Sequence, residues 1–211
     1  MSMDHRRAVA EHNLEAIVDA AERLVLARAA PTISAVAKSA GVSRPTVYAH
    51  FPGRKELLEA VVARSVRRWI AATERVEPDR GPAYEALLRV IEVGWQEISR
   101  SSGIAAAAAA ELDTAAMRRS HMRGQVLIRK LAERGQADGV FRDDVPADWL
   151  VSSFFALVHA AHEDVTARRL SSKAALDALT KTVPDLFSAR ATAPRGGAAR
   201  TTSGATSSSG P

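Results

Sequence analysis

The sequence predicts an all-α protein, in which an N-terminal three-helix unit is joined by a long helix to a larger C-terminal helical region. Apolar residues recur three and four apart in successive segments, which is the period of helices with one buried face. No alternating run of β-branched and aromatic residues meets hairpin turn chemistry, so no strand is predicted. Glycines and prolines separate the helical segments at residues 31, 41, 52–53, 78–82, 135–139 and 146.

The first three predicted helices have recognisable ends. An amphipathic apolar stripe over residues 14–28 indicates the first helix. Thr32 stands at the N-cap position of a second, short helix, which Gly41 closes. Ser43 is placed to cap a third helix over residues 44–50. The region therefore contains two short capped helices separated by a glycine-containing turn.

The larger region is predicted to be helical throughout. A long fourth helix follows Gly53 and continues to the break at residues 78–82. Further helices are expected over about residues 84–98, 105–110, 117–131, 146–161 and 176–183. Pro184 must end or kink the last of them. Residues 189–211 hold no large apolar residue that could offset their ordering entropy, so they are predicted to form a disordered tail.

The positive charge of the chain is unevenly distributed. The formal charge is +5, but residues 189–211 contribute three arginines and no acid, so the body is nearly neutral. Residues 31–55 hold the basic side chains Lys38, Arg44, Arg54 and Lys55 without one Asp or Glu. A local positive field of this kind favours a nucleic-acid partner.

Composition also excludes several classes of protein. The chain has no cysteine, which rules out disulfides, thiol catalysis and cysteine-ligated metal sites. No run of about 18 apolar residues could span a bilayer, and no apolar stretch follows the charged N-terminus as in a secretory signal. We therefore expect no membrane partner and a cytoplasmic location.

Residues 32–51, TISAVAKSAGVSRPTVYAHF, have the order of parts of a helix-turn-helix. In such a unit the second helix lies in the DNA major groove with its N-terminal residues at the base edges. The residues expected there are Ser43, Arg44, Pro45 and Thr46. Arg44 can offer a bidentate fork to a guanine, and Thr46 can bond phosphate or touch a thymine methyl group. Tyr48 and His50 can reach phosphates.

This segment resembles the TetR family of transcriptional regulators over about residues 14–60. The resemblance is carried by Thr32, Val36, Ala37, Ala40–Gly41–Val42–Ser43, Thr46–Val47–Tyr48, His50–Phe51, Arg54 and Leu57. It implies phosphate contacts at Thr32, Thr46, Tyr48, His50 and Arg54, and base readers at residues 43–46. Lys55 is a further candidate contact or a solvated charge. Two departures are visible: residues 29–31 replace the glycine common before the threonine, and Arg54 replaces the usual lysine.

The family resemblance also implies a division of labour along the chain. Residues 1–55 are expected to be the DNA-binding domain, residues 56–188 the helical ligand-binding and dimerisation domain, and residues 189–211 the tail. Such a protein is a homodimeric repressor on a palindromic operator in double-stranded DNA, released by a small-molecule inducer. We expect an apolar inducer of unknown identity, and no cofactor or metal.

Candidate residues for pairing and for ligand binding come from the helical stripes. Residues 146–166 are apolar around more than one face, which is more apolar surface than one core needs. The expected dimer contacts are Leu150, Phe154, Leu157 and Ala161. The expected ligand contacts are Trp69, Trp95, Met117 and His121, although aromatic residues and methionines at helical spacing are also the usual content of a core.

Two other functions were weighed against this interpretation. An enzyme would need a nucleophile elbow, a glycine-rich phosphate loop or an HExxH pair, and the sequence contains none of these. A nonspecific architectural DNA binder would use diffuse basic surface instead of four reader residues on a neutral body. His159, His162 and Glu163 suggest metal binding only faintly and read as a polar helix face.

Overall fold

The computed structural model describes residues 3–112 and 114–189, with the side chains of residues 3, 4, 6, 109 and 114–121 left out. The described chain is helical, and its only β-type pairing is an isolated antiparallel bridge between Phe141 and Ser188. The helices are α1 (Met3–Leu26), α2 (Ile33–Ala40), α3 (Arg44–His50), α4 (Arg54–Glu74), α5 (Ala83–Arg100), α6 (Ser102–Glu111), α7 (Thr114–Ala137), α8 (Ala147–Thr166) and α9 (Ser172–Phe187). The predicted tail from residue 190 onward lies outside the described residues.

The predicted caps of the two short helices are confirmed. The Thr32 hydroxyl accepts a hydrogen bond from the backbone N–H of Ala35, and Ser43 accepts one from Thr46, each over 3.2 Å. Gly41 ends α2 with a φ of 69°, in the left-handed region that glycine occupies without strain. These caps set where α3 begins and therefore which residues lie at its leading end.

Two helix boundaries differ from the predictions. Helix α1 begins at Met3, well before the apolar stripe that predicted it. Its first turns lie on the surface and include an exposed Arg7–Glu11 pair, so no apolar periodicity marks them. Helix α9 continues through Pro184 to Phe187, because a proline removes only its own N–H bond and the buried Phe187 ring holds the last turn in the core.

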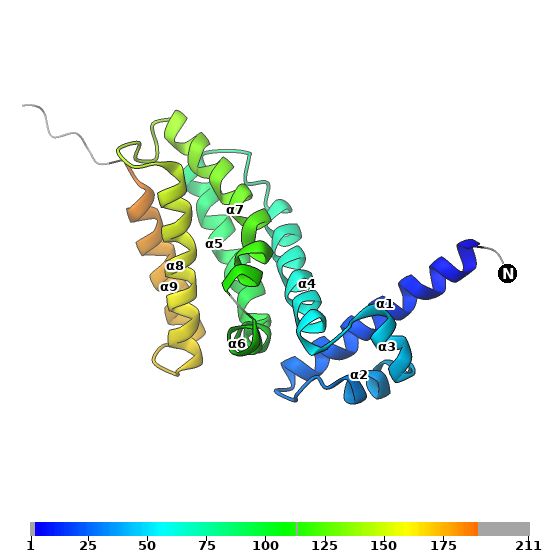
Figure 1. Cartoon of the computed structure of the whole chain (residues 1–211). Coiled ribbons are helices and arrows are strands. Elements are labelled where there is room, and N and C mark those ends of the chain that lie inside the picture. The colour runs from blue at the N-terminus through cyan, green and yellow to red at the C-terminus, as the bar shows by residue number, and fades with distance from the viewer. Residues whose placement is uncertain (1–2, 113, 190–211) are drawn as a thin grey trace, which may run out of the picture.

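The apolar interior is divided into two clusters. The N-terminal core is built from α1, α2 and α3, together with residues 57–62 of α4 and Ile104 and Ala108 of α6. The C-terminal core is built from α5, α7, α8 and α9, and Trp69 of α4 belongs to it. Figure 1 shows α1–α3 at one end of the molecule, the bundle at the other, and α4 between them. The N-terminal core thus extends past residue 55, the predicted domain boundary, and the two clusters divide within α4.

Ion pairs fasten α1 to α4. Arg64 pairs with Asp19 over 2.5 Å and lies 3.5 Å from Glu15, and Arg68 pairs with Glu22. Glu22 is the only buried charged residue among those described. A buried carboxylate without a partner is costly, and Glu22 has two cations beside it, Arg68 and, at 3.7 Å, Arg64.

The connection from α7 to α8 closes the far end of the bundle. The Phe141 ring lies so close to Gly135 that a methyl group on Gly135 would come within 2.0 Å of it. Phe141 also meets the Phe187 ring edge to face, at 5.3 Å between centroids. The backbone N–H of Arg142 donates to the Phe187 carbonyl, which joins this connection to the end of α9. None of the helices among the described residues is long and apolar enough to cross a membrane.

Candidate nucleic-acid interface and cavity

Helix α3 has an inner and an outer face. Val47 is fully buried and Phe51 nearly so, and both belong to the N-terminal core. Arg44, Pro45 and Tyr48 are exposed, with Tyr48 at 55%. The structure therefore places the side chains predicted to read DNA on an accessible surface, held by a helix whose opposite face is fixed in a core.

The hydroxyl groups at the predicted interface are already oriented. The Ser43 and Thr46 hydroxyl oxygens lie 2.7 Å apart, and the Ser43 oxygen also caps α3. The Thr32 oxygen caps α2 in the same way. A capping hydroxyl accepts from the backbone and keeps its own proton, so Thr32 and Ser43 can cap their helices and still donate to a phosphate. His50 is half-buried at the end of α3.

The two basic residues that open α4 differ in environment. Lys55 is exposed. The guanidinium of Arg54 pairs with the carboxylate of Glu111, the last residue of α6, at 2.5 Å between Nη2 and Oε1. Nothing in the sequence near residue 111 indicates that α6 ends beside the start of α4, so the sequence does not predict a role for Glu111. The predicted phosphate contact at Arg54 therefore has an acidic neighbour from the other part of the chain.

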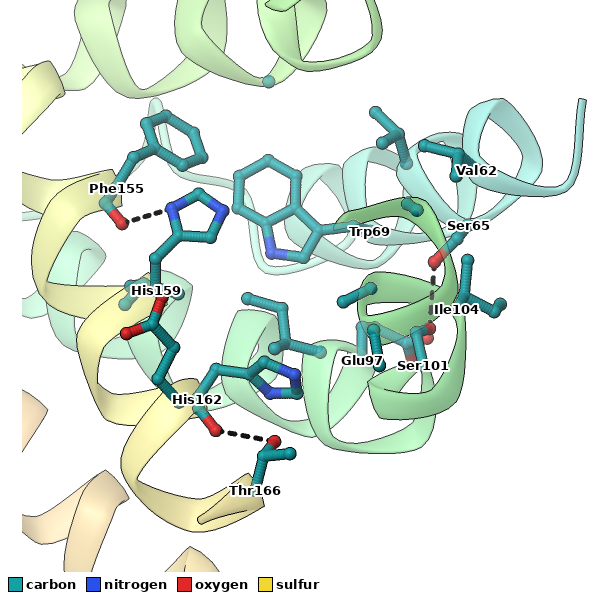
Figure 2. A pocket seen from close by; sticks show the side chains of 18 of the residues that line it. Val62, Ser65, Trp69, Glu97, Ser101, Ile104, Phe155, His159, His162 and Thr166 are labelled. Atoms are coloured by element: carbon teal, nitrogen blue, oxygen red, sulfur yellow. Dashed lines mark hydrogen bonds between the residues drawn. The ribbon is translucent and has the colours of Figure 1, made fainter. Parts of the chain in front are cut away.

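A cavity of about 530 Å³ lies between α4 and helices α5 to α8. Its walls are mostly apolar, and Figure 2 shows the Trp69 indole extending into it from α4, opposite the imidazoles of α8. The residues that line it are Val62, Ser65, Val66, Trp69, Glu97, Ile98, Ser101, Ile104, Ala105, Ala106, Ala108, Gly124, Phe155, Val158, His159, His162, Glu163, Thr166, Ala167 and Arg169. A cavity of this size is in the range that holds a small organic molecule.

The four predicted ligand contacts have different positions. Trp69 lines the cavity. Trp95 does not, because its indole N–H donates to the carbonyl and hydroxyl oxygens of Ser172, each at 3.1 Å, and its ring is 4% exposed within the C-terminal core. The prediction of a ligand contact at Trp95 thus disagrees with the geometry. The side chains of Met117 and His121, both within α7, lie outside the described residues.

Two glycines hold the Trp69 ring in place. A methyl group on Gly94 of α5 would lie 2.8 Å from Nε1 of the indole, and one on Gly124 of α7 would lie 3.0 Å from Cζ3. The ring also meets Phe155 of α8 in a tilted arrangement at 6.1 Å between centroids. Trp69 can therefore occupy this position only because two facing helices carry no side chain there.

The polar wall of the cavity comes from α8. His159 Nδ1 lies 2.7 Å from the Phe155 carbonyl oxygen, an arrangement in which a ring N–H on Nδ1 donates to that carbonyl. Burial lowers the pKa of His162, His159 lowers it further, and Glu163 opposes the shift. His162 is therefore neutral at neutral pH. These residues were assigned to a polar helix face in the sequence; the spacing of Phe155, His159 and His162 on one side of a helix was the available signal.

The predicted dimer contacts are mostly interior. Leu150 is fully buried and Phe154 is 2% exposed, and both belong to the C-terminal core of their own chain. They have no surface left for a partner, so their assignment to a dimer interface is corrected: this stripe of α8 covers α7 and α9. Leu157 and Ala161 are only partly buried. Trp149, at the start of the same helix, is 61% exposed.

A helix-turn-helix with an exposed second helix, continued by one long helix into a bundle with a cavity, defines a class of helical DNA-binding regulators. Residues 17–61 match the family model described as bacterial regulatory proteins, tetR family. The N-terminal part of the chain is therefore similar to the DNA-binding part of TetR-family regulators. The predicted resemblance to this family and the predicted all-helical fold are both confirmed.

Two curated relatives match part of the chain. The chain is 37% identical over 82 residues to the transcriptional repressor LfrR of Mycolicibacterium smegmatis, which covers 39% of this chain and 43% of that protein. It is 41% identical over 58 residues to the uncharacterised regulator TtgW of Pseudomonas putida, covering 26% of this chain and 43% of that one. The chain thus matches less than half the length of each of these relatives.

Solved structures match over most of the chain. A putative TetR-family regulator from Rhodococcus sp. superposes with a TM-score of 0.70 at 23% identity, covering 84% of this chain and all of that one. LfrR in complex with proflavine gives 0.61 at 24% identity, with coverages of 84% and 97%. A putative regulator from Saccharomonospora viridis in complex with choline gives 0.66 at 22% identity, with coverages of 82% and 93%. At these identities the similarity concerns the fold.

Proposed function

We propose that this protein is a sequence-specific transcriptional repressor that leaves a palindromic operator when a small molecule enters the cavity. One observation carries the proposal: α4 is a single helix that begins directly after the turn that ends α3 and carries a wall of the cavity at Trp69. A ligand changes DNA affinity only if it binds two arrangements of the protein differently. A continuous helix shared by both sites gives such a difference a physical route.

On the DNA side, the leading residues of α3 read bases and the surrounding residues hold phosphates. The proposed base readers are Ser43, Arg44, Pro45 and Thr46, which stand at the exposed end of α3. The proposed phosphate contacts are Thr32, Thr46, Tyr48, His50, Arg54 and Lys55. The support for this division is geometric, because an α-helix enters the major groove with its N-terminal end at the bases while its flanks meet the backbone.

The repressor acts as a homodimer in this proposal. One helix-turn-helix reads few base pairs, and a two-fold pair doubles the readout on a palindrome. The partly buried Leu157 and Ala161 of α8 remain the candidate contacts, and α9, which packs against α8, would complete the paired surface. Leu150 and Phe154 support this surface from inside and do not contact the partner.

The proposed ligand is small, largely apolar and positively charged. The walls offer the aromatic rings of Trp69 and Phe155, and a ring face attracts a cation. Two carboxylates, Glu97 and Glu163, line the cavity; Arg100 pairs with the first of them, at 2.6 Å, so Glu163 is the stronger attraction. The one lining cation among the described residues, Arg169, is paired with Asp164. Proflavine and choline, bound in two structures of the same fold, are both organic cations.

The test uses DNA selection and fluorescence together. Duplexes that the protein enriches from a random pool should share a palindrome, and the protein should bind that palindrome well above random DNA. Among the three tryptophans, a Trp95→Phe, Trp149→Phe variant keeps only Trp69 as a reporter. Organic cations that quench Trp69 should release the selected DNA in a gel shift. Quenching that saturates without any change in DNA affinity would refute ligand control and leave DNA binding standing.

A further inference from the structure

We propose that Glu111 lowers the DNA affinity of this protein by competing with a DNA phosphate for the guanidinium of Arg54. The inference rests on the proposed function, since it requires the α3 surface to bind DNA. It adds a residue from α6, outside the helix-turn-helix, to the determinants of DNA affinity.

The geometry places the two charges at the junction between the two parts of the chain. Arg54 is the first residue of α4, directly after the turn that ends α3, so its side chain stands at the edge of the proposed DNA-binding face. Its Nη2 lies 2.5 Å from Oε1 of Glu111, the last residue of α6. The side chains are 40% and 29% exposed, so both remain accessible to solvent and to a bound strand.

The Arg54–Glu111 ion pair can be exchanged for a contact between Arg54 and a DNA phosphate. Nε of Arg54 is buried and has no hydrogen-bond partner among the described residues, so the single contact with Glu111 leaves the guanidinium incompletely satisfied. An ion pair this exposed is weak, whereas a phosphate can accept two parallel bonds from one guanidinium. A phosphate can therefore replace the carboxylate. While Glu111 is paired, it neutralises Arg54 and places a negative charge near the DNA backbone.

Helix α6 connects this pair to the cavity. Ile104, Ala105 and Ala108 line the cavity from α6, and Glu111 ends the same ten-residue helix. A bound molecule that displaced α6 would therefore also displace the Glu111 carboxylate relative to Arg54.

The test compares Glu111→Gln with the wild type on DNA alone, so it needs no inducer. Binding of two fluorescein-labelled duplexes, one enriched by the wild type and one of random sequence, is followed by anisotropy over a series of KCl concentrations. Glu111→Gln should bind both duplexes about three- to tenfold more tightly at low salt, because phosphate contacts carry no sequence information. Its plot of log K against log salt should keep the wild-type slope, because Arg54 neutralises the same phosphate in both complexes.

A matched control separates competition for Arg54 from a general loss of negative charge. Glu56→Gln removes the same charge from an exposed position in the first turn of α4. It should give a smaller gain that persists when Arg54→Gln is also present. The gain from Glu111→Gln should fall to that of the control in the Arg54→Gln background, because Glu111 acts through Arg54.

Each result decides the matter. An unchanged affinity in Glu111→Gln, a loss of affinity, or a full gain that survives Arg54→Gln would each overturn the inference. Glu111→Ala, checked for folding by circular dichroism, provides a second variant that should behave like Glu111→Gln. If the wild type itself binds neither duplex, the proposed function fails, which is a different outcome from failure of the competition.

Discussion

The two ends of this molecule use their helices in opposite ways. At the N-terminal end, short capped helices bury Val47 and Phe51 and present Arg44 and Tyr48 outward, so function lies on the outer face of a solid core. At the C-terminal end, long helices enclose a cavity of about 530 Å³, and the proposed function lies on their inner faces. A DNA reader needs side chains on a rigid frame, whereas a sensor needs a space that its occupant can change.

This difference explains why the function of the N-terminal end can be predicted from the sequence and the cavity of the C-terminal end cannot. The proposed DNA-binding face depends on caps and a turn within twenty consecutive residues, so their spacing is enough to predict it. The cavity is assembled from helices that are distant in the chain, and Trp69 and His162 meet only through the fold. The following predictions either separate the two ends further or show that they behave as one unit.

The largest effect is expected at the bundle end. Gly135→Ala should lower the free energy of unfolding by about 3 kcal/mol, because the new methyl group would overlap the Phe141 ring. Gly139→Ala is the control: that glycine has a positive φ but open space around it, so it should cost only about 1 kcal/mol. Urea unfolding followed by circular dichroism gives both values. Equal losses would mean that the α7–α8 connection yields to the methyl group.

The next effect concerns pairing. Leu157→Lys should weaken dimerisation by about 2–3 kcal/mol, since it places a charge within the proposed interface. Sedimentation at micromolar concentration should then report a monomer, and operator binding should be lost with it. Leu170→Lys makes the same chemical change in the exposed connection after α8 and should remain dimeric. A dimeric Leu157→Lys protein would place the interface on another surface.

A somewhat smaller effect distinguishes readers from phosphate contacts within the N-terminal face. Arg44→Ala should cost about 2 kcal/mol on the operator and relax base preference at one position of each half-site. Tyr48→Phe and Arg54→Ala should each weaken binding to operator and random DNA alike. Only Arg54→Ala should also make the salt dependence of binding shallower, because it alone removes a formal charge. Parallel titrations on the two duplexes measure this. If Arg44→Ala weakened both duplexes equally, the assigned orientation of α3 in the groove would be wrong.

The smallest expected effect is a pH dependence of the free energy of unfolding that arises from His162 in the bundle. Burial lowers the pKa of His162 below its usual value, so the folded protein favours the neutral imidazole. The resulting contribution to stability is present above the unfolded-state pKa and is lost as the pH falls through the lowered folded-state pKa. His162→Gln should therefore lose less stability than the wild type between pH 7 and 5. Urea midpoints at the two pH values test this, and parallel losses would contradict it.

Much of the fold could be predicted from the helical period and from the caps, and the reasons for the failures are specific. A periodic stripe shows which face of a helix points inward, but it does not distinguish a solid core from the wall of a cavity. Trp69 and Trp95 both lie on inward stripes, and only the packing of Gly94 and Gly124 around Trp69 and the bond from Trp95 to Ser172 separate them. For this reason Trp95 was predicted as a ligand contact.

The prediction of dimer contacts at Leu150 and Phe154 was wrong for a related reason. Leu150 and Phe154 were interpreted as surplus apolar surface, but α7 and α9 pack against α8 from two sides and bury both residues. An apolar run on more than one face of a helix indicates several neighbours, and it does not tell whether one of them belongs to another chain. The Arg54–Glu111 pair was beyond prediction because its partners are brought together by the placement of α6 against α4.

Because Trp69 is held between Gly94 and Gly124, a tilt of α4 would pivot about this residue inside the bundle. Arg54 lies about 22 Å along the helix from Trp69, at about 1.5 Å per residue. A tilt of only about 5° around the indole would displace the start of α4 by about 2 Å. In a two-fold dimer both arms move, so the spacing of the recognition helices, which must match a DNA repeat of about 34–36 Å or a multiple of it, could shift by up to about 4 Å. A small displacement beside the Trp69 ring would thereby become a larger change in the spacing of the two α3 helices.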